Sequence, residues 1–235
     1  EFTRQDLHRR WQIPLEKITT LWPGPTLPWP SATRPWFRAQ QRRILQRLKL
    51  DQTPFFLFPA HPWPHKNHRF LLSAFEQALP DLPDDCILVM TGRPLPPGHE
   101  GTAELAEGIA RKRVRHLGYR TPLEMTALYS RALALVFPSL FEGFGLPLVD
   151  AFYAGCPVLS SDRAALPEVG GDAALYASPA DRSAWASGMA RLAADPELRR
   201  TCTAAGHARR EQFSWRKTAL QTIQLYEQVF HELYE

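Results

Sequence analysis

The sequence has few of the features that mark a secreted or membrane protein. Its 235 residues include three cysteines, Cys86, Cys156 and Cys202, which are widely spaced and odd in number. This pattern argues against a disulfide framework or a zinc site and suits a reduced, cytosolic interior. No run of about 18 apolar residues occurs, which excludes a transmembrane helix. The chain also starts without a methionine or an apolar signal region, so we expect a fragment of a longer protein.

A strong excess of one charge is absent as well. The 28 Lys and Arg residues stand against 24 Asp and Glu residues, a formal net charge of +4. The basic residues gather in two runs, 38–49 and 111–116. Each run fits a solvated helix face or helix end, and alternatively a surface that attracts phosphates or anionic lipid headgroups. Neither run carries interleaved aromatic side chains for base stacking, so we expect no nucleic-acid partner.

Proline, in contrast, is abundant, with 22 residues. Prolines and a glycine interrupt any regular element between residues 22 and 35. Large aromatic side chains such as Trp22 and Trp29 are unusual in a free linker, so we expect this proline-rich strip to lie against a folded domain. We therefore assign residues 1–35 to a connector and residues 36–235 to one domain.

Short apolar runs alternate with helical patterns along that domain. The runs are apolar on successive residues, which is typical of parallel strands buried on both faces. They cover residues 55–58, 86–90, 133–137 and, more weakly, 157–159. Helical patterns cover residues 36–50, 67–79, 102–111, 122–131 and 147–154, and the chain after residue 180 is predicted to be all helix. This alternation predicts an α/β fold, a Rossmann-like doubly wound parallel sheet with C-terminal helices.

The loop after the third apolar run has the composition of a ligand site. Gly143 and Gly145 let the backbone approach a ligand closely, and Pro147 suits the first turn of a helix. The free amides at such a helix start attract a phosphate or a ring of hydroxyls. Glu142 lies before the helix and Asp150 about one turn into it, so both could reach the same cleft. Alternatively, the glycines form a tight turn, and the carboxylates are a helix cap and a surface charge.

From this loop onward the sequence resembles a known family. Residues 138–161, PSLFEGFGLPLVDAFYAGCPVLSS, resemble the signature of the retaining glycosyltransferases of family 4, which have the GT-B fold and a motif of two glutamates separated by seven residues. Further matches follow the family's order: His65-Lys66-Asn67, Leu117-Gly118-Tyr119, and the segments ALPEV at 165–169 and GDAA at 171–174. The likeness covers residue 55 to the C-terminus.

The resemblance implies that the chain is one half of a GT-B enzyme, the domain that binds the sugar nucleotide. The connector would then lead from a missing N-terminal acceptor domain. The implied activity is hexosyl transfer, with retention, from a UDP- or GDP-linked sugar to a glycan or lipid-linked acceptor in lipopolysaccharide or other surface polysaccharide synthesis. Such an enzyme would act in the cytoplasm, at the inner face of the membrane and with peripheral membrane contact. We expect the isolated fragment to be inactive, and the alternative is a nucleotide-sugar-binding module without catalysis.

The resemblance also implies roles for the loop after the third apolar run. Glu142 would meet hydroxyls of the donor sugar. The amides of Gly143, Phe144, Gly145 and Leu146 would meet the sugar and the diphosphate.

Other segments would complete the donor site. Lys66 would hold the diphosphate and stabilise the negative charge of the leaving group, so Lys66 and Glu142 are the expected catalytic residues. Asp150 would meet the ribose hydroxyls. The turn at Gly118 and Tyr119 would meet the base, although a tyrosine of the core is an equally good interpretation.

Two positions depart from the family pattern. Asp150 is one methylene shorter than the usual glutamate, so a ribose contact could be longer, water-bridged or absent. His61 stands where many members have an arginine, and a histidine cannot offer a guanidinium fork to the diphosphate. With His65 and His68 it also suggests a metal site, but the spacing is not a ligand signature and the family generally works without bound metal. We therefore expect His61 to contact the donor, and no metal or cofactor beyond the nucleotide-sugar co-substrate.

Overall fold

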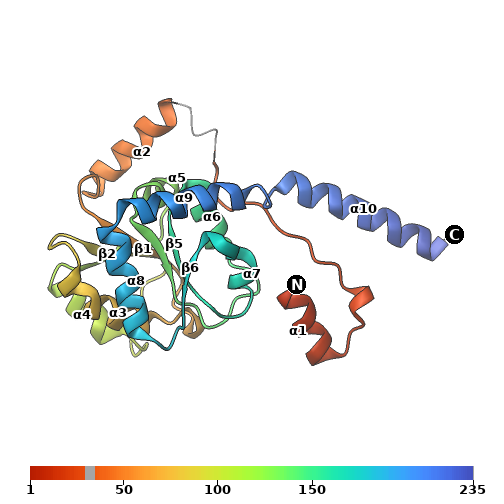
Figure 1. Cartoon of the computed structure of the whole chain (residues 1–235), viewed down its shortest axis with the longest axis horizontal. Helices are drawn as coiled ribbons and strands as arrows, with labels where there is room; N and C mark the ends of the chain where they lie inside the picture. The colour runs from red at the N-terminus through yellow and green to blue at the C-terminus, as the bar shows by residue number, and fades with distance from the viewer. Residues whose placement is uncertain (30–34, 235) are drawn as a thin grey trace.

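The chain forms a sheet of six parallel strands between two layers of helices, as shown by a computed structural model that describes residues 1–29 and 35–234 (Figure 1). The sheet order is β3-β2-β1-β4-β5-β6. The strands are β1 (Phe55–Pro59), β2 (Ile87–Thr91), β3 (Val114–His116), β4 (Ala134–Phe137), β5 (Val158–Ser161) and β6 (Leu175–Ala177). This order confirms the Rossmann-like, doubly wound fold. The four expected strands are present, while β3 and β6, of three residues each, escaped the sequence analysis.

Helices cover both faces of this sheet. On one face α3 (His68–Ala78) packs against α4 (Thr102–Ala110) and α8 (Arg182–Ala194), and on the other α5 (Pro122–Arg131) packs against α2 (Pro35–Arg47) and α6 (Leu146–Ala154). The other helices are α1 (Phe2–Trp11), α7 (Leu166–Gly170), α9 (Pro196–Arg210) and α10 (Trp215–Tyr234). The described residues also form four 3-10 turns, Leu15–Lys17, Pro64–Lys66, Leu79–Asp81 and Gly171–Ala173.

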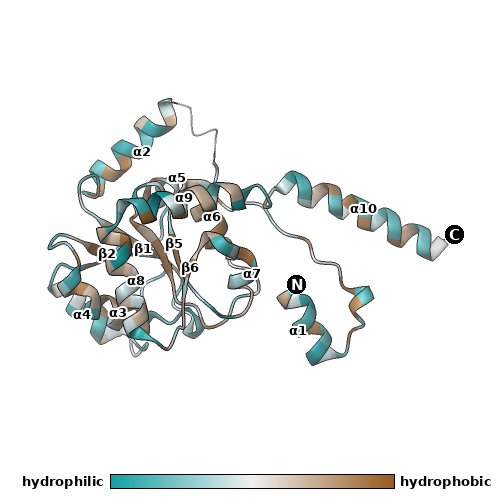
Figure 2. Cartoon of the chain, viewed as in Figure 1, coloured by the Kyte–Doolittle hydropathy of each residue, from teal (hydrophilic) through white to brown (hydrophobic). Residues whose placement is uncertain are grey.

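The core lies along the central strands, whose side chains face helices on both sides. Residues 55–58 of β1 and all of β4 are buried, and the strand ribbons in the middle of Figure 2 are hydrophobic. Trp185 of α8 is also fully buried, and its indole nitrogen donates a hydrogen bond to the Ser178 carbonyl at 3.0 Å. The indole therefore fills the core without leaving a polar group unpaired. The three free cysteines are buried too.

The two ends of the chain extend beyond this layered body. Helix α10 projects away from the sheet, and α1 contacts the body through its first residues, where the Phe2 amide donates a hydrogen bond to Glu168 of α7 (Figure 1). No helix in the described part of the chain has the length and apolar character needed to cross a bilayer. Trp22 and Trp29 pack against the core, as expected for the proline-rich strip. Residues 30–34 of that strip lie outside the described residues, and the domain boundary at residue 35 stays a prediction.

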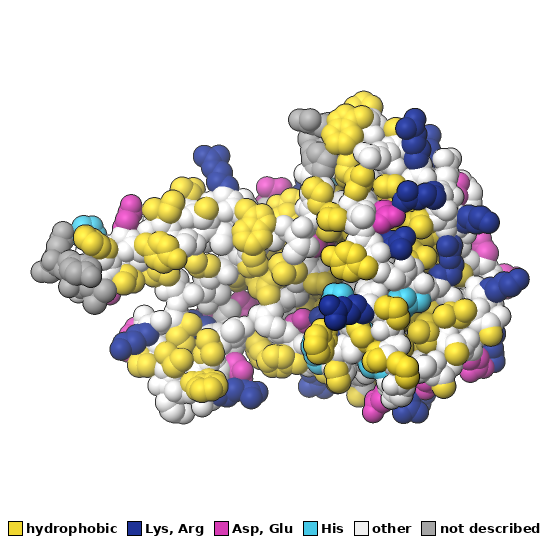
Figure 3. Space-filling view, turned by 180° about the vertical axis from the view of Figure 1, so that it is seen from behind, with side chains coloured by type: hydrophobic (Ala, Val, Ile, Leu, Met, Phe, Trp, Pro, Cys, Tyr) yellow, Lys and Arg dark blue, Asp and Glu magenta, His cyan; other side chains and the backbone are white. Residues whose placement is uncertain are grey.

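Part of the two basic runs is used in ion pairs with neighbouring helices. The run 38–49 lies mainly on α2, where Arg47 pairs with Glu124 of α5 at 2.6 Å. The run 111–116 spans the end of α4 and strand β3, and its Arg111 pairs with Glu76 and Glu107. On the face drawn in Figure 3, basic side chains stand among acidic and hydrophobic ones. For these arginines the helix-face interpretation is therefore the better one.

His68, the first residue of α3, is buried with an unsatisfied ring nitrogen. Its side chain is 3% exposed and packs edge-on against the rings of Phe58 and His99, with centroids 4.9 and 5.5 Å away. Its Nδ1 has no hydrogen-bond partner among the described residues. Burial, reinforced by the charge of His99, lowers the pKa of His68 to about 4. The folded protein therefore holds this imidazole neutral.

The buried His68 should make the stability of the fold depend on pH. Its folded-state pKa lies below the ordinary value of 6.5, so the unfolded chain binds more protons between about pH 6.5 and 4. Stability that is fully present above pH 6.5 should be lost as the pH falls through this window, by up to about 3 kcal/mol for the full pKa difference. Urea unfolding at pH 7, 6 and 5 measures the loss. The variant His68→Leu should lose less stability over this range than the unaltered chain, and equal losses would contradict the assignment.

Candidate functional site

The reversal of strand order places two loops side by side at the carboxyl edge of the sheet. The chain winds from β1 to β2 and β3 in one direction and from β4 to β5 and β6 in the other, so the order reverses between β1 and β4. Ligands of open α/β sheets bind at such a switch point. The loop after β1 carries Lys66, and the loop after β4 carries Glu142. The topology therefore brings together the two residues that were expected to be catalytic.

Lys66 and Glu142 form an ion pair across these loops. The Lys66 Nζ lies 2.5 Å from the Glu142 Oε1, and the two side chains are 16% and 13% exposed. Ser139 donates a hydrogen bond from its Oγ to the same oxygen at 2.5 Å. The Lys66 ammonium also lies 4.9 Å from the centroid of the Phe137 ring, a distance that favours a cation–π interaction. The pair thus neutralises two charges that are largely removed from water.

Backbone and amide contacts hold the two loops together. Asn67 adopts the left-handed conformation (φ 61°), which asparagine tolerates better than most residues. Its side-chain amide donates to the carbonyls of Pro138 and Pro179 at 3.3 and 3.1 Å. The His65 carbonyl accepts from the Leu140 amide at 2.7 Å and from the Ser139 hydroxyl at 3.0 Å. Sequence analysis gave Ser139 no role, because a serine after a strand carries no specific signal.

The loop around Gly143 and Gly145, which we call the sugar loop (residues 142–146), ends in helix α6. Gly145 caps this helix with φ 115°, and a Cβ there would lie 2.7 Å from a methyl group of Leu166. A larger residue would therefore be strained at this position. The first turn of α6 leaves backbone N–H groups without intrahelical acceptors, at the positive end of the helix dipole. Phe144 of this loop is half-buried, and Leu146 is the first helical residue, while their contacts with sugar and diphosphate stay a prediction.

His61 and Tyr119 meet at a neighbouring cavity of about 310 Å³. His61 accepts a hydrogen bond at Nδ1 from the Arg93 amide at 3.2 Å, so in the neutral ring the proton sits on Nε2. Tyr119 is 74% exposed, which contradicts its interpretation as a core tyrosine. Gly118, which precedes Tyr119, lies in a turn with φ 71°. The Gly118 carbonyl accepts a hydrogen bond from the Gly92 amide at 3.1 Å.

Asp150 is engaged by the proline-rich strip. Its side chain is 3% exposed, and the donors to its oxygens belong to Thr26, Leu27 and Trp29. Burial raises the pKa of Asp150 above its ordinary value, an effect that these hydrogen bonds oppose. The ribose contact expected for Asp150 stays a prediction. Sequence analysis missed the contact with Thr26, because the two residues lie far apart in sequence and no pattern links them.

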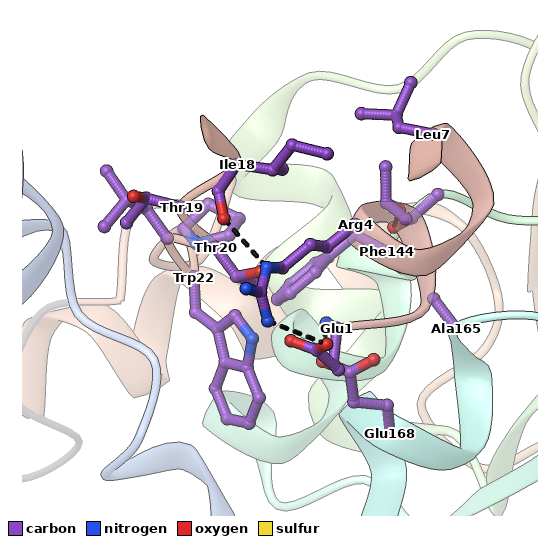
Figure 4. A pocket seen from close by; sticks show the side chains of 14 residues that line it. Glu1, Arg4, Leu7, Ile18, Thr19, Thr20, Trp22, Phe144, Ala165 and Glu168 are labelled. Carbon is purple, nitrogen blue, oxygen red and sulfur yellow. Dashed lines mark hydrogen bonds and ion pairs between the residues drawn. The ribbon is translucent and has the colours of Figure 1, made fainter. Parts of the chain in front are cut away.

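A second cavity lies on the other side of the sugar loop, beside α1 (Figure 4). It measures about 300 Å³, and Phe144 and Glu168 lie in its wall. Thr3 of α1 donates a hydrogen bond from its Oγ1 to the Gly143 carbonyl at 2.8 Å, and the Phe2 amide donates to Glu168 at 2.7 Å. The sugar loop is therefore contacted by residues from the very start of the chain.

No group of three or more His, Cys, Asp or Glu side chains in residues 1–29 and 35–234 is arranged to hold a metal ion. His68, one of the three histidines that suggested such a site, faces the rings of Phe58 and His99. The positive charge at the switch point comes from Lys66.

Comparison with known proteins gives a consistent family. The family model described as "Glycosyl transferases group 1" matches residues 40–209. The chain is 33% identical over 229 residues to O-antigen chain mannosyltransferase B of Escherichia coli, an alignment that covers 96% of this chain and 58% of that protein.

Solved structures share the fold. Sucrose-phosphate synthase from Thermosynechococcus elongatus superimposes with a TM-score of 0.74 at 26% identity, covering 98% of this chain and 57% of that one. A glycosyltransferase from Rickettsia africae ESF-5 superimposes with a TM-score of 0.82, covering 97% of this chain and 62% of that one, and its 16% identity shows the fold alone. The chain spans less than two thirds of the length of each of these three proteins. With its sheet, its paired loops and the family match over residues 40–209, the chain belongs to the glycosyl transferases group 1 family.

Proposed function

We propose that this chain is the donor-binding part of a glycosyltransferase that transfers a hexose from a nucleoside diphosphate sugar. The observation that carries the proposal is the pairing of Lys66 with Glu142 at the switch point, beside the start of helix α6. A cation, a carboxylate and a helix N-terminus in one place suit a ligand that has a diphosphate at one end and hydroxyl groups at the other.

Each group has a defined task in this proposal. As the bond between sugar and diphosphate breaks, negative charge develops on the leaving phosphate, and a fixed ammonium with oriented amides stabilises it. Lys66 and the first amides of α6 supply that charge, so no metal ion is needed. Glu142 accepts hydrogen bonds from sugar hydroxyls once Lys66 turns to the phosphate. Gly143, Phe144, Gly145 and Leu146 form the surface on which sugar and phosphate lie.

The nucleoside end of the donor fits the cavity beside His61 and Tyr119. At about 310 Å³ this cavity is at the lower end of the size range of small-molecule sites. The exposed Tyr119 ring offers a face for the base, and the Nε2–H of a neutral His61 offers a donor to phosphate or ribose.

The names of relatives narrow the substrates further. Because the relative from Escherichia coli is called an O-antigen chain mannosyltransferase, we propose a mannosyl donor and a glycan or lipid-linked acceptor in surface polysaccharide synthesis. On the resemblance to glycosyltransferase family 4 we also propose retention of configuration. On the same ground we propose that the protein acts at the cytoplasmic face of the membrane, with peripheral membrane contact.

Calorimetric titration with UDP, GDP and their mannose and glucose conjugates tests the proposed function. We expect saturable binding to the unaltered chain, and the same affinity in EDTA because the proposed site uses no metal. If none of these ligands binds, the proposed function is refuted.

A second candidate function is nucleotide-sugar binding without catalysis by these 235 residues. It is favoured by the length of the relative from Escherichia coli, of which this chain spans 58%. In this case the acceptor site would belong to a domain that precedes the connector. Transfer of radiolabelled mannose to an acceptor by this chain alone would exclude the second candidate.

Replacing Lys66 should weaken nucleotide binding strongly. A charge-assisted hydrogen bond contributes about 1.5–3 kcal/mol, so Lys66→Met should weaken the binding of UDP or GDP about 10- to 100-fold. The matched variant Lys17→Met, at an exposed position of the connector, should bind as the unaltered chain does. Titration calorimetry together with a melting curve checks both variants. Full affinity in a folded Lys66→Met protein would remove Lys66 from the site.

Replacing Glu142 should have the opposite effect on the free nucleotide. In the absence of ligand the Glu142 carboxylate occupies Lys66 and repels an incoming diphosphate. Glu142→Gln removes that competition, so UDP or GDP without a sugar should bind more tightly, by on the order of 1 kcal/mol or about fivefold. The conjugated sugar should no longer add affinity. Weaker binding of the free nucleotide to Glu142→Gln would show that the pair does not compete with the diphosphate.

A further inference from the structure

The described part of the proline-rich strip, residues 22–29, crosses the domain between the sugar loop and the start of α10. Trp22 stacks on Phe213 with centroids 5.3 Å apart and meets the ring of Phe144 edge-on at 6.4 Å. Pro25 accepts a hydrogen bond at its carbonyl from the Trp215 indole at 2.8 Å. Gly24 passes so close to Trp215 that a Cβ would lie 2.6 Å from its backbone nitrogen. The strip therefore packs closely against the domain.

Asp150 accepts hydrogen bonds from residues 26–29 of the strip. Its Oδ1 accepts from the backbone amides of Thr26 and Leu27 at 3.0 and 3.1 Å and from the Trp29 indole at 3.3 Å. Its Oδ2 accepts from the Thr26 hydroxyl. Three donors share Oδ1 and one engages Oδ2, which keeps a free lone pair, but the whole side chain is 3% exposed. Little of the carboxylate is open to a ligand, so a ribose hydroxyl would have to compete with the strip for it.

The strip also forms part of the nucleotide cavity. Thr26 and Leu27 line the 310 Å³ cavity together with His61 and Tyr119. The two amides that Asp150 binds therefore belong to residues that shape this cavity. Whatever fixes the strip also fixes this part of the cavity wall.

We propose that Asp150 is a positioning residue that anchors residues 26–29 of the strip and thereby holds one wall of the nucleotide cavity in place. This inference rests on the proposed function for the ligand of the cavity, whereas the anchoring itself does not depend on it. It assigns Asp150 a role that differs from direct contact with the ribose.

The choice of aspartate at this position agrees with the anchor role. The strip reaches Asp150 with backbone amides, so the carboxylate must lie close to α6. A glutamate would carry the carboxylate one methylene further into residues that are already packed against the core. The residue typical of the family should therefore fit this chain less well than aspartate does.

Hydrogen exchange without ligand tests the anchor. Asp150→Asn places an amide nitrogen among groups that are all donors, so the amides of Thr26 and Leu27 should exchange at least about tenfold faster. Thr26→Val removes one donor and should give a smaller increase in the same peptide. The matched control Asp84→Asn, an exposed aspartate before β2, should leave this peptide unchanged. Equal exchange in Asp150→Asn and the unaltered chain would overturn the proposal.

Nucleotide affinity separates positioning from ribose contact. The probes are whichever of UDP and GDP binds the unaltered chain, and the 2′,3′-dideoxy form of that nucleotide, titrated at a temperature well below the melting point of each variant. If Asp150 positions the wall, Asp150→Asn and Asp150→Glu should weaken both probes by the same several-fold factor, and Thr26→Val should weaken both to a lesser extent.

Three results would contradict this assignment. A loss restricted to the probe that carries ribose hydroxyls, with affinity kept by Asp150→Glu, would identify Asp150 as a ribose ligand. A lowered melting temperature with unchanged affinity for both probes would reduce Asp150 to a structural role. If the unaltered chain binds neither probe nor any other nucleotide, the proposed function and the role of the cavity wall both fail, and hydrogen exchange still decides whether Asp150 anchors the strip.

Discussion

The ion pair between Lys66 and Glu142 joins the two loops that leave the sheet where its strand order reverses. Neither charge would be stable alone at this depth, because a largely buried charge needs a partner. Each loop therefore depends on the other for its conformation, and Asn67 and the His65 carbonyl add neutral contacts across the same junction. The loop after β1 carries both His61 and Lys66, and the loop with Glu142 leads into the start of α6. The two charges at this junction are balanced against each other.

The sequence predicted the central strands and the loops that follow them for a clear physical reason. Strands β1, β2 and β4 are covered by helices on both faces, so nearly every side chain must be apolar and the runs are continuous. Strands β3 and β6 lie at the edges of the sheet, where Arg115 and Tyr176 remain in contact with water. Their short, mixed sequences resemble loops. The polar side chains that let an edge strand face water also interrupt the apolar run by which a buried strand is predicted.

The candidate site was predictable in part. The motifs around Lys66 and Glu142 identified both loops, and parallel topology required the loops to lie at one edge. The partners of Asp150 were beyond sequence analysis, because Thr26 lies 124 residues away and no periodicity connects the two. The exposure of Tyr119 was also undecided, since a tyrosine after a glycine fits both a core and a surface. Contacts made by side chains across long separations are specified by the whole fold and by no local pattern.

The meeting of Pro25 with Trp215 has a consequence for how such a protein is assembled. The polypeptide enters the layered body at the strip and leaves it at the start of α10, and these two points are joined by a hydrogen bond. The chain of this body therefore begins and ends at neighbouring points. A unit whose entrance and exit coincide can be joined to different neighbouring domains, or exchanged between proteins, without disturbing its interior. Modularity of this kind is a property of the chain path and does not depend on what the candidate site binds.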